Sequence, residues 1–333
     1  NEGKLKAFDT ANPAAPALLG TFDGNFGKAD FGGVFGVKAK GAVVTVADGD
    51  GNFQLMDVSN PADMKKHGEY LLGGYIQGFD VSETLIGAAD SNGHLKVIDI
   101  TNPADPKLRG SYVSDDQAYL GKVFISGKRV YATRGGDAVQ IIDIENPDAP
   151  GKIGQYDAGD LMWPPAVVIS GNTMAAAVRP WEEGPSLKFV DTTDAGNIQV
   201  IGRYPGYASG IAWAGNLAAV ATETAIDIVD LQNPAKPRRM ADINNIIFSH
   251  RLTMALSGGL LYAPYNSGNG GIGIAIIDVS RFLRPLIAGT PGDLNHSERV
   301  DLADAVLALQ VLAGRTPLET VFTDADVDGD GRI

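Results

Sequence analysis

LKVIDITNP, residues 95–103, is the stretch that decides the fold, because versions of it return down most of the chain. Each copy contains alternating apolar residues, then an aspartate, then a turn that usually includes Asn-Pro. The seven copies are KLKAFDTANP (4–13), FQLMDVSNP (53–61), LKVIDITNP (95–103), VQIIDIENP (139–147), LKFVDTTDA (187–195), IDIVDLQNP (226–234) and IAIIDVSRF (274–282). By subtraction, their aspartates stand 39 to 48 residues apart, and a period of this size is typical of propeller blades.

The residues around each phrase divide the repeat into four predicted strands. The phrase itself is one strand, and the segment after its turn, such as KLRGSYV (107–113), is predicted as an outer strand. A Gly-containing turn, as in KVFISGK (122–128), then joins two inner strands rich in small residues, which suits strands crowded near an axis. The sequence therefore predicts an all-β fold, a β-propeller of four-stranded blades. A β-solenoid is the alternative, although its coils are usually shorter than this repeat.

The number of blades depends on how the N-terminal residues are used. Six inner hairpins are predicted, which gives six blades, and they begin near Val34, Phe79, Val123, Val167, Ile211 and Leu252. The first phrase and the strand ALLGTF (17–22) leave two possibilities open. They complete the last blade, or they belong to a seventh blade whose inner hairpin lies upstream. The segment KLKAF could instead pair with a neighbouring chain by strand addition.

The repeat resembles the LVIVD-repeat family, whose name describes the motif seen in LKVIDITNP and VQIIDIENP. The resemblance covers residues 4 to about 282 and implies an exported surface protein, with no agreed catalytic residues to transfer. The repeated aspartate has a structural explanation, because Asx side chains accept hydrogen bonds from backbone N–H groups in turns.

The bulk composition excludes some classes of partner. The net charge of −13 argues against nucleic acid, because neutralising phosphates requires clustered Lys and Arg. No apolar run approaches the roughly 20 residues that cross a bilayer, so no membrane span is expected. The chain has no cysteine, which excludes disulfides and thiolate metal sites. It begins at Asn1 without a signal-peptide pattern, which suggests that a leader was removed or that the N-terminus was trimmed. The extracellular or cell-surface location that we expect is what the resemblance to exported surface proteins implies.

The pattern changes after Pro291 to two loops with the spacing of calcium ligands. The first loop offers Asp293, Asn295, Ser297, the carbonyl of Arg299, Asp301 and Asp304, and the second offers Asp326, Asp328, Asp330 and the carbonyl of Arg332. Apolar residues at helical spacing between Val306 and Leu312 follow the first loop. Glu298 stands where such loops prefer glycine, and the second loop ends at Ile333 before its last ligands. A solvated acidic tail is the alternative interpretation.

The duplicated loop and helix resemble a type I dockerin with a truncated second repeat, over residues 292–333. The resemblance implies calcium as cofactor, an EF-hand-like helical module and a cohesin-like protein partner. We therefore expect a propeller over residues 1–282, a linker over 283–291 and a calcium-binding module over 292–333. The predicted function is noncatalytic assembly through protein partners, including self-assembly.

The residues of the propeller loops suggest an alternative function. They place His250, Arg179 and Glu223 where they could support a hydrolase or lactonase activity, and the same loops could bind carbohydrate. Segment ADGDGNFQLMD (47–57) also has oxygen ligands at alternate positions, and it is read either as a partial calcium loop or as an ordinary hairpin turn, the reading we favour.

Overall fold

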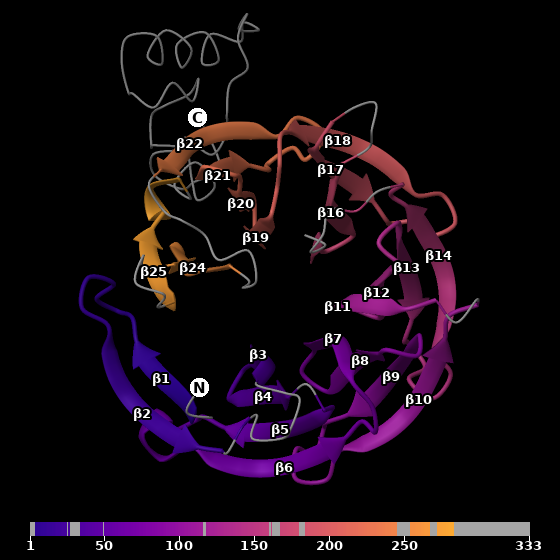
Figure 1. Cartoon of the computed structure of the whole chain (residues 1–333), viewed down its shortest axis with the longest axis vertical. Helices are drawn as coiled ribbons and strands as arrows, with labels where there is room; N and C mark the ends of the chain where they lie inside the picture. The colour runs from indigo at the N-terminus through magenta and orange to yellow at the C-terminus, as the bar shows by residue number, and fades with distance from the viewer. Residues whose placement is uncertain are drawn as a thin grey trace, which may run out of the picture.

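The computed structural model describes residues 4–24, 26, 34–48, 50–115, 118–159, 161, 167–179, 184–244, 254–266 and 272–282. These residues form seven antiparallel β-sheets set around a ring (Figure 1). Five sheets have four strands, one has three and one has two. The propeller prediction is confirmed, and its predicted inner strands lie toward the centre of the ring.

In each four-stranded sheet the strands follow one another in sequence, from the strand nearest the centre of the ring to the outermost strand. The four-stranded sheets comprise β3 (Val34–Lys40), β4 (Val43–Asp48), β5 (Asn52–Asp57) and β6 (Lys65–Leu71); β7 (Ile76–Val81), β8 (Leu85–Asp90), β9 (His94–Asp99) and β10 (Lys107–Val113); β11 (Leu120–Ser126), β12 (Arg129–Arg134), β13 (Ala138–Asp143) and β14 (Gly151–Asp157); β15 (Val167–Ser170), β16 (Thr173–Val178), β17 (Ser186–Asp191) and β18 (Gln199–Pro205); and β19 (Gly210–Ala214), β20 (Leu217–Ala221), β21 (Ala225–Asp230) and β22 (Arg238–Asn244). The three-stranded sheet comprises β23 (Ala255–Ser257), β24 (Leu260–Asn266) and β25 (Ile272–Asp278), and the two-stranded sheet comprises β1 (Lys4–Asp9) and β2 (Ala17–Asp23).

The N-terminal strands form a sheet of their own. β1 pairs with β2 and, in the part of the chain that the structure describes, with no strand of the β23–β25 sheet. The described strands β1 and β2 therefore do not complete the last blade by pairing with it. β1 contains a copy of the phrase and β2 follows it, so the pair corresponds to the two outermost strands of a blade.

The predicted dockerin-like module and its linker lie outside the described residues. Only two short 3-10 helices, η1 (Pro61–Asp63) and η2 (Ser280–Phe282), occur within them. No helix in the described ranges is long and apolar enough to cross a membrane.

The repeated aspartate caps the turn that follows each phrase, as the sequence predicted. Asp99 Oδ1 accepts a hydrogen bond from the backbone N–H of Thr101 at 2.8 Å, and Asn102 Oδ1 accepts one from Ala104 at 3.2 Å. The equivalent aspartate bond forms at Asp9, Asp57, Asp143, Asp191, Asp230 and Asp278, with lengths of 2.8 or 2.9 Å. The phrase is therefore a strand that ends in its own local turn signal, which explains why it repeats.

Apolar residues fill the spaces between neighbouring sheets. Phe53 and Leu55 of β5 pack against Phe79 and Ile86 of the next sheet, and the Phe53 and Phe79 rings meet edge to face at 5.3 Å. Alternate residues of each phrase face one neighbour and the others face the second, so apolar residues occur on both faces of β5, β9, β13, β17 and β21, interrupted by one polar residue in the middle of each strand.

A glycine in the outer strand fits five of the sheets against the turn of the next sheet. A Cβ added at Gly202 of β18 would lie 2.0 Å from the carbonyl oxygen of Pro234, which no side chain can tolerate. The same relation joins Gly20 to Pro61, Gly68 to Pro103, Gly110 to Pro147 and Gly154 to Ala195. Close backbone approach of this kind requires glycine.

Candidate functional site

The fold separates two faces of the ring. In each four-stranded sheet, the turn between the second and third strands and the connection to the next sheet lie on one face, which we call the loop face. The capped turns after the phrases lie on the opposite face, which we call the turn face. Arg179 and Glu223, two of the predicted catalytic residues, belong to the loop face.

Two of these predicted residues are on separate loops. Arg179 follows β16 and Glu223 lies between β20 and β21, and both are exposed. Neither forms a hydrogen bond or ion pair with another described residue. His250 lies outside the described residues.

Asp90, an acidic residue on the loop face, has a structural role. Asp90 at the end of β8 is buried, and its Oδ1 accepts backbone hydrogen bonds from Asn92 at 2.9 Å and His94 at 3.0 Å. Its second oxygen lies 3.1 Å from His94 Nδ1. Because both oxygens are already used, Asp90 stabilises the β8–β9 turn and is poorly suited to hold a ligand.

The segment with alternating oxygen ligands forms a hairpin turn. Asp48 Oδ1 accepts a hydrogen bond from the backbone N–H of Asn52 at 2.9 Å, and Gly51 has a φ of +87°, which favours glycine. The structure thus has the hairpin turn that we favoured over a partial calcium loop. Among the described residues, no group of three or more His, Cys, Asp or Glu side chains could hold a metal ion.

Tyrosines lie at the entries to the inner strands on the loop face. Tyr75 precedes β7 and is exposed, whereas Tyr119 precedes β11 and donates to Gln77 Oε1 at 2.9 Å. Burial raises the pKa of the Tyr119 hydroxyl, so it remains a neutral donor at physiological pH. Trp163 and Trp181 lie outside the described residues.

An axial polar cluster, comprising Lys38, Asp80 and Lys122, was missed by the sequence analysis. The three residues come from β3, β7 and β11, the innermost strands of three consecutive sheets (Figure 1). Lys38 Nζ lies 3.1 Å from Asp80 Oδ1, and Asp80 Oδ2 accepts a hydrogen bond from the backbone N–H of Ile125 at 2.8 Å. Burial, and to a lesser degree the charge of Lys38, lowers the pKa of Lys122. Charged residues in strands otherwise built from small and apolar residues were the available signal.

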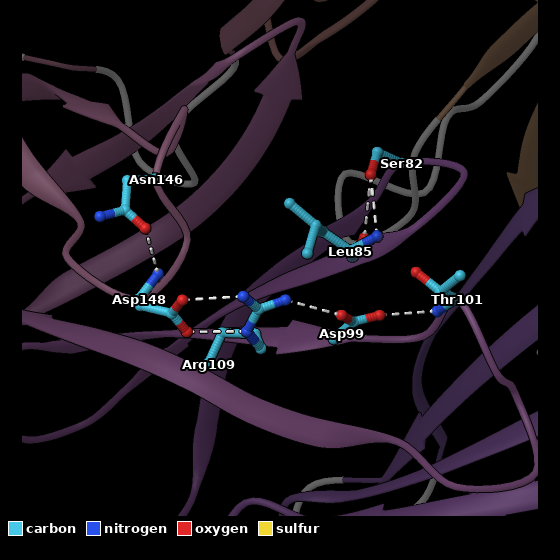
Figure 2. Close-up of polar contacts among 7 residues, drawn as sticks. All are labelled: Ser82, Leu85, Asp99, Thr101, Arg109, Asn146 and Asp148. Atoms are coloured by element: carbon cyan, nitrogen blue, oxygen red, sulfur yellow. Dashed lines mark hydrogen bonds and ion pairs between the residues drawn. The ribbon is translucent and has the colours of Figure 1, made fainter.

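An ion-pair clasp joins two sheets at the turn face (Figure 2). Arg109 of β10 donates from Nε and Nη2 to the two oxygens of Asp148 at 2.7 and 2.8 Å, and from Nη1 to Asp99 Oδ2 at 2.9 Å. The Thr101 hydrogen bonds, and then Arg109, hold the pKa of Asp99 below its usual range, and Arg109 does the same for Asp148. This bidentate pairing links the two sheets at the surface.

Comparison with known protein families agrees with the repeated architecture. Four segments of the chain match the LVIVD repeat, namely residues 32–71, 73–114, 119–158 and 205–244. No curated protein sequence matches the chain.

Solved structures with the same fold are distant in sequence. A functionally unknown protein from Desulfotomaculum acetoxidans DSM 771 is 14% identical, with a TM-score of 0.63 over 82% of this chain and 96% of the other. A chain of the mitotic checkpoint complex is 12% identical, with a TM-score of 0.59 over 82% of both chains. Saccharomyces cerevisiae Sqt1 is 12% identical, with a TM-score of 0.53 over 82% of this chain and 79% of the other. At these identities the likeness establishes a propeller and carries no information on ligands.

Proposed function

We propose that this chain is an exported, noncatalytic scaffold, in which the propeller presents an interaction surface and residues 292–333 form a calcium-dependent attachment module. The observation that carries the proposal is the spacing of oxygen ligands in the two C-terminal loops. The attachment joins the protein to a cohesin-like partner at the cell surface or in an extracellular assembly.

Features of the propeller are consistent with a scaffold. Loop-face carboxylates such as Asp48 and Asp90 hold their own turns, and Arg179 and Glu223 stand apart on exposed loops. The similar propeller of the mitotic checkpoint complex belongs to a protein assembly, which is the use of the fold that we propose here.

The mechanism couples calcium to the fold of the tail. Asp293, Asp301 and Asp304 in the first loop and Asp326, Asp328 and Asp330 in the second bring like charges together, and calcium neutralises them. Binding free energy then becomes folding free energy of the module, so attachment depends on extracellular calcium.

The test compares the whole chain in calcium and in chelator. Wild-type protein is expected to show a calcium-dependent thermal shift and to retain a specific extracellular protein in a pull-down, and the pair Asp293→Ala and Asp326→Ala should lose both. Glu83→Ala with Glu223→Ala, which removes two exposed carboxylates from the propeller, is the control with the same change in charge. Equal shifts in wild type and the Asp293→Ala, Asp326→Ala pair would place calcium elsewhere and refute the proposal.

A further inference from the structure

The three charged residues of the axial polar cluster depart from the repeat. The strand registers place Lys38 of β3 and Asp80 of β7 at equivalent positions, and the other three four-stranded sheets have apolar residues there, namely Phe124, Val168 and Ala212. Lys122 of β11 occupies a position at which three other sheets have glycine, namely Gly36, Gly78 and Gly210. The fold therefore does not require these charges. Departures from an otherwise consistent pattern are expected at functional sites.

Close approach of two inner strands brings Lys122 into the cluster. A Cβ added at Gly78 of β7 would lie 2.7 Å from the Cα of Lys122, so the two backbones are in direct contact. The backbone N–H of Lys122 donates to Thr133 Oγ1 at 2.9 Å, which fixes the point from which the side chain starts. From the preceding sheet, Lys38 Nζ lies 3.1 Å from Asp80 Oδ1. The three charges thus come from consecutive sheets at the axis of the ring (Figure 1).

The cluster contains two cations and one anion. Both oxygens of Asp80 are used within it, because Oδ1 contacts Lys38 and Oδ2 accepts the hydrogen bond from the backbone N–H of Ile125. Lys122 is half-buried, and no carboxylate among the described residues forms an ion pair with it. Burial lowers the pKa of Lys122, and the positive charge of Lys38 lowers it further.

A structural role explains two of the three residues. Lys38 and Asp80 form an ion pair between neighbouring sheets, and Asp80 also holds the backbone of the third sheet through Ile125. Lys122 has no such contact in the part of the chain that the structure describes, and it replaces a glycine. A desolvated ammonium group without a counter-ion costs stability, and a bound anion would offset that cost.

We propose that the axial polar cluster is a binding site for a small oxyanion, a phosphate or a carboxylate, held by the ammonium groups of Lys38 and Lys122. Each ammonium group offers three N–H donors and a compact positive charge, which suits the oxygens of either anion. Asp80 orients Lys38 but repels the ligand, so it limits the affinity. A position on the innermost strands suits a small molecule better than a folded protein.

The inference goes beyond the proposed scaffold role and does not rest on the C-terminal loops. Its test therefore uses the whole chain after dialysis into calcium-free buffer. Inorganic phosphate and, separately, succinate are titrated into the protein at pH 7 and low ionic strength, and binding is measured by calorimetry. We expect saturable binding that weakens as sodium chloride is added, because salt screens the charges. The probe that binds more tightly identifies the oxyanion as a phosphate or a carboxylate.

Three variants locate the bound anion. Lys122→Gly restores the glycine of the other sheets, so it should fold, and it should weaken binding by about tenfold because one cation is lost. Asp80→Asn keeps an acceptor for the Ile125 N–H and removes the negative charge, so it should bind more tightly than wild type. Lys40→Met, at an exposed lysine of β3, makes the same change in net charge as Lys122→Gly and should bind as wild type does.

Two outcomes would overturn the proposal. The first is that neither probe binds to the wild-type chain. The second is that Lys122→Gly binds as tightly as wild type, which would place the bound anion elsewhere. Weaker binding by an Asp80→Asn variant of unchanged stability would also contradict the proposal, because the negative charge of Asp80 should oppose an anion.

Discussion

The side-chain hydroxyl groups of Thr10 and Tyr262 lie 2.9 Å apart, and their hydrogen bond joins residues 252 positions apart in sequence. Thr10 follows β1 and Tyr262 belongs to β24, so this bond links the first sheet of the ring to the last (Figure 1). Other neighbouring sheets are consecutive in the chain and are held together by short connections as well as by packing. Within the described ranges no connection of this kind joins the β23–β25 sheet to the β1–β2 sheet, so the Thr10–Tyr262 bond helps to close the ring.

Removing one hydroxyl of this pair should destabilise the ring. Tyr262→Phe is expected to lower the free energy of unfolding by about 1 kcal/mol, measured by urea denaturation, because a half-buried hydrogen bond is lost. Thr10→Val should have a similar effect, and the double variant should lose less than the sum. Tyr75→Phe, at an exposed tyrosine, is the control and should change stability by less than about 0.5 kcal/mol. Equal effects of Tyr262→Phe and Tyr75→Phe would show that the bond does not stabilise the ring.

The outer-strand glycines should tolerate no side chain. Gly202→Ala is expected to lower the free energy of unfolding by about 1–3 kcal/mol, because its Cβ would overlap the Pro234 carbonyl and force β18 away from the next sheet. Gly151→Ala, in strand β14, adds a Cβ with no atom within 4 Å and should be close to neutral. Urea denaturation of both variants checks this. A neutral Gly202→Ala would mean that the two sheets separate at little cost.

The sequence could predict those features that depend on local chemistry. Asp99 and Asn102 cap turns within two residues of themselves, so the phrase, its strand and its turn were all predicted correctly. The alternation of apolar and small residues likewise predicted the inner and outer strands correctly. The requirement for Gly202 was not predicted, because it comes from the Pro234 carbonyl of the next sheet.

The candidate sites were harder to predict because they depend on contacts between distant segments. Lys38 and Asp80 form an ion pair between two sheets, and no sequence motif predicts this pairing. Asp90 is a loop carboxylate by its place in the sequence, yet its oxygens are occupied by its own turn. Propeller loops are polar whatever their role, so residue type alone could not separate a ligand from a turn cap.

The free energy of unfolding should fall in acid because the aspartates that cap the turns become protonated. The pKa of Asp99 is lowered by its Thr101 hydrogen bonds and then by Arg109, so its stabilising contribution is present above the unfolded pKa of about 4 and is lost as pH falls through the folded value. Asp99→Asn keeps an acceptor for Thr101 but cannot titrate. Urea denaturation at pH 7, 5 and 3 is expected to show a smaller acid loss in Asp99→Asn than in wild type. Asp50→Asn, in the β4–β5 turn, is the control, and an equal acid loss in Asp99→Asn and Asp50→Asn would refute the assignment.

Lys122 should destabilise the folded chain at neutral pH. Burial, and then the charge of Lys38, lowers the pKa of Lys122 below its ordinary value of 10.5, so the unfolded chain binds more protons than the folded chain between the two values. Stability should therefore rise with pH as it approaches 10.5, and Lys122→Met should reduce this rise. At pH 7 the variant is expected to be at least as stable as wild type, because it removes the desolvation of an ammonium group. Urea denaturation from pH 7 to 10 tests this, with Lys40→Met, at an exposed lysine of β3, as the control. A less stable Lys122→Met with an unchanged pH slope would mean that the ammonium group has a stabilising partner in the folded protein.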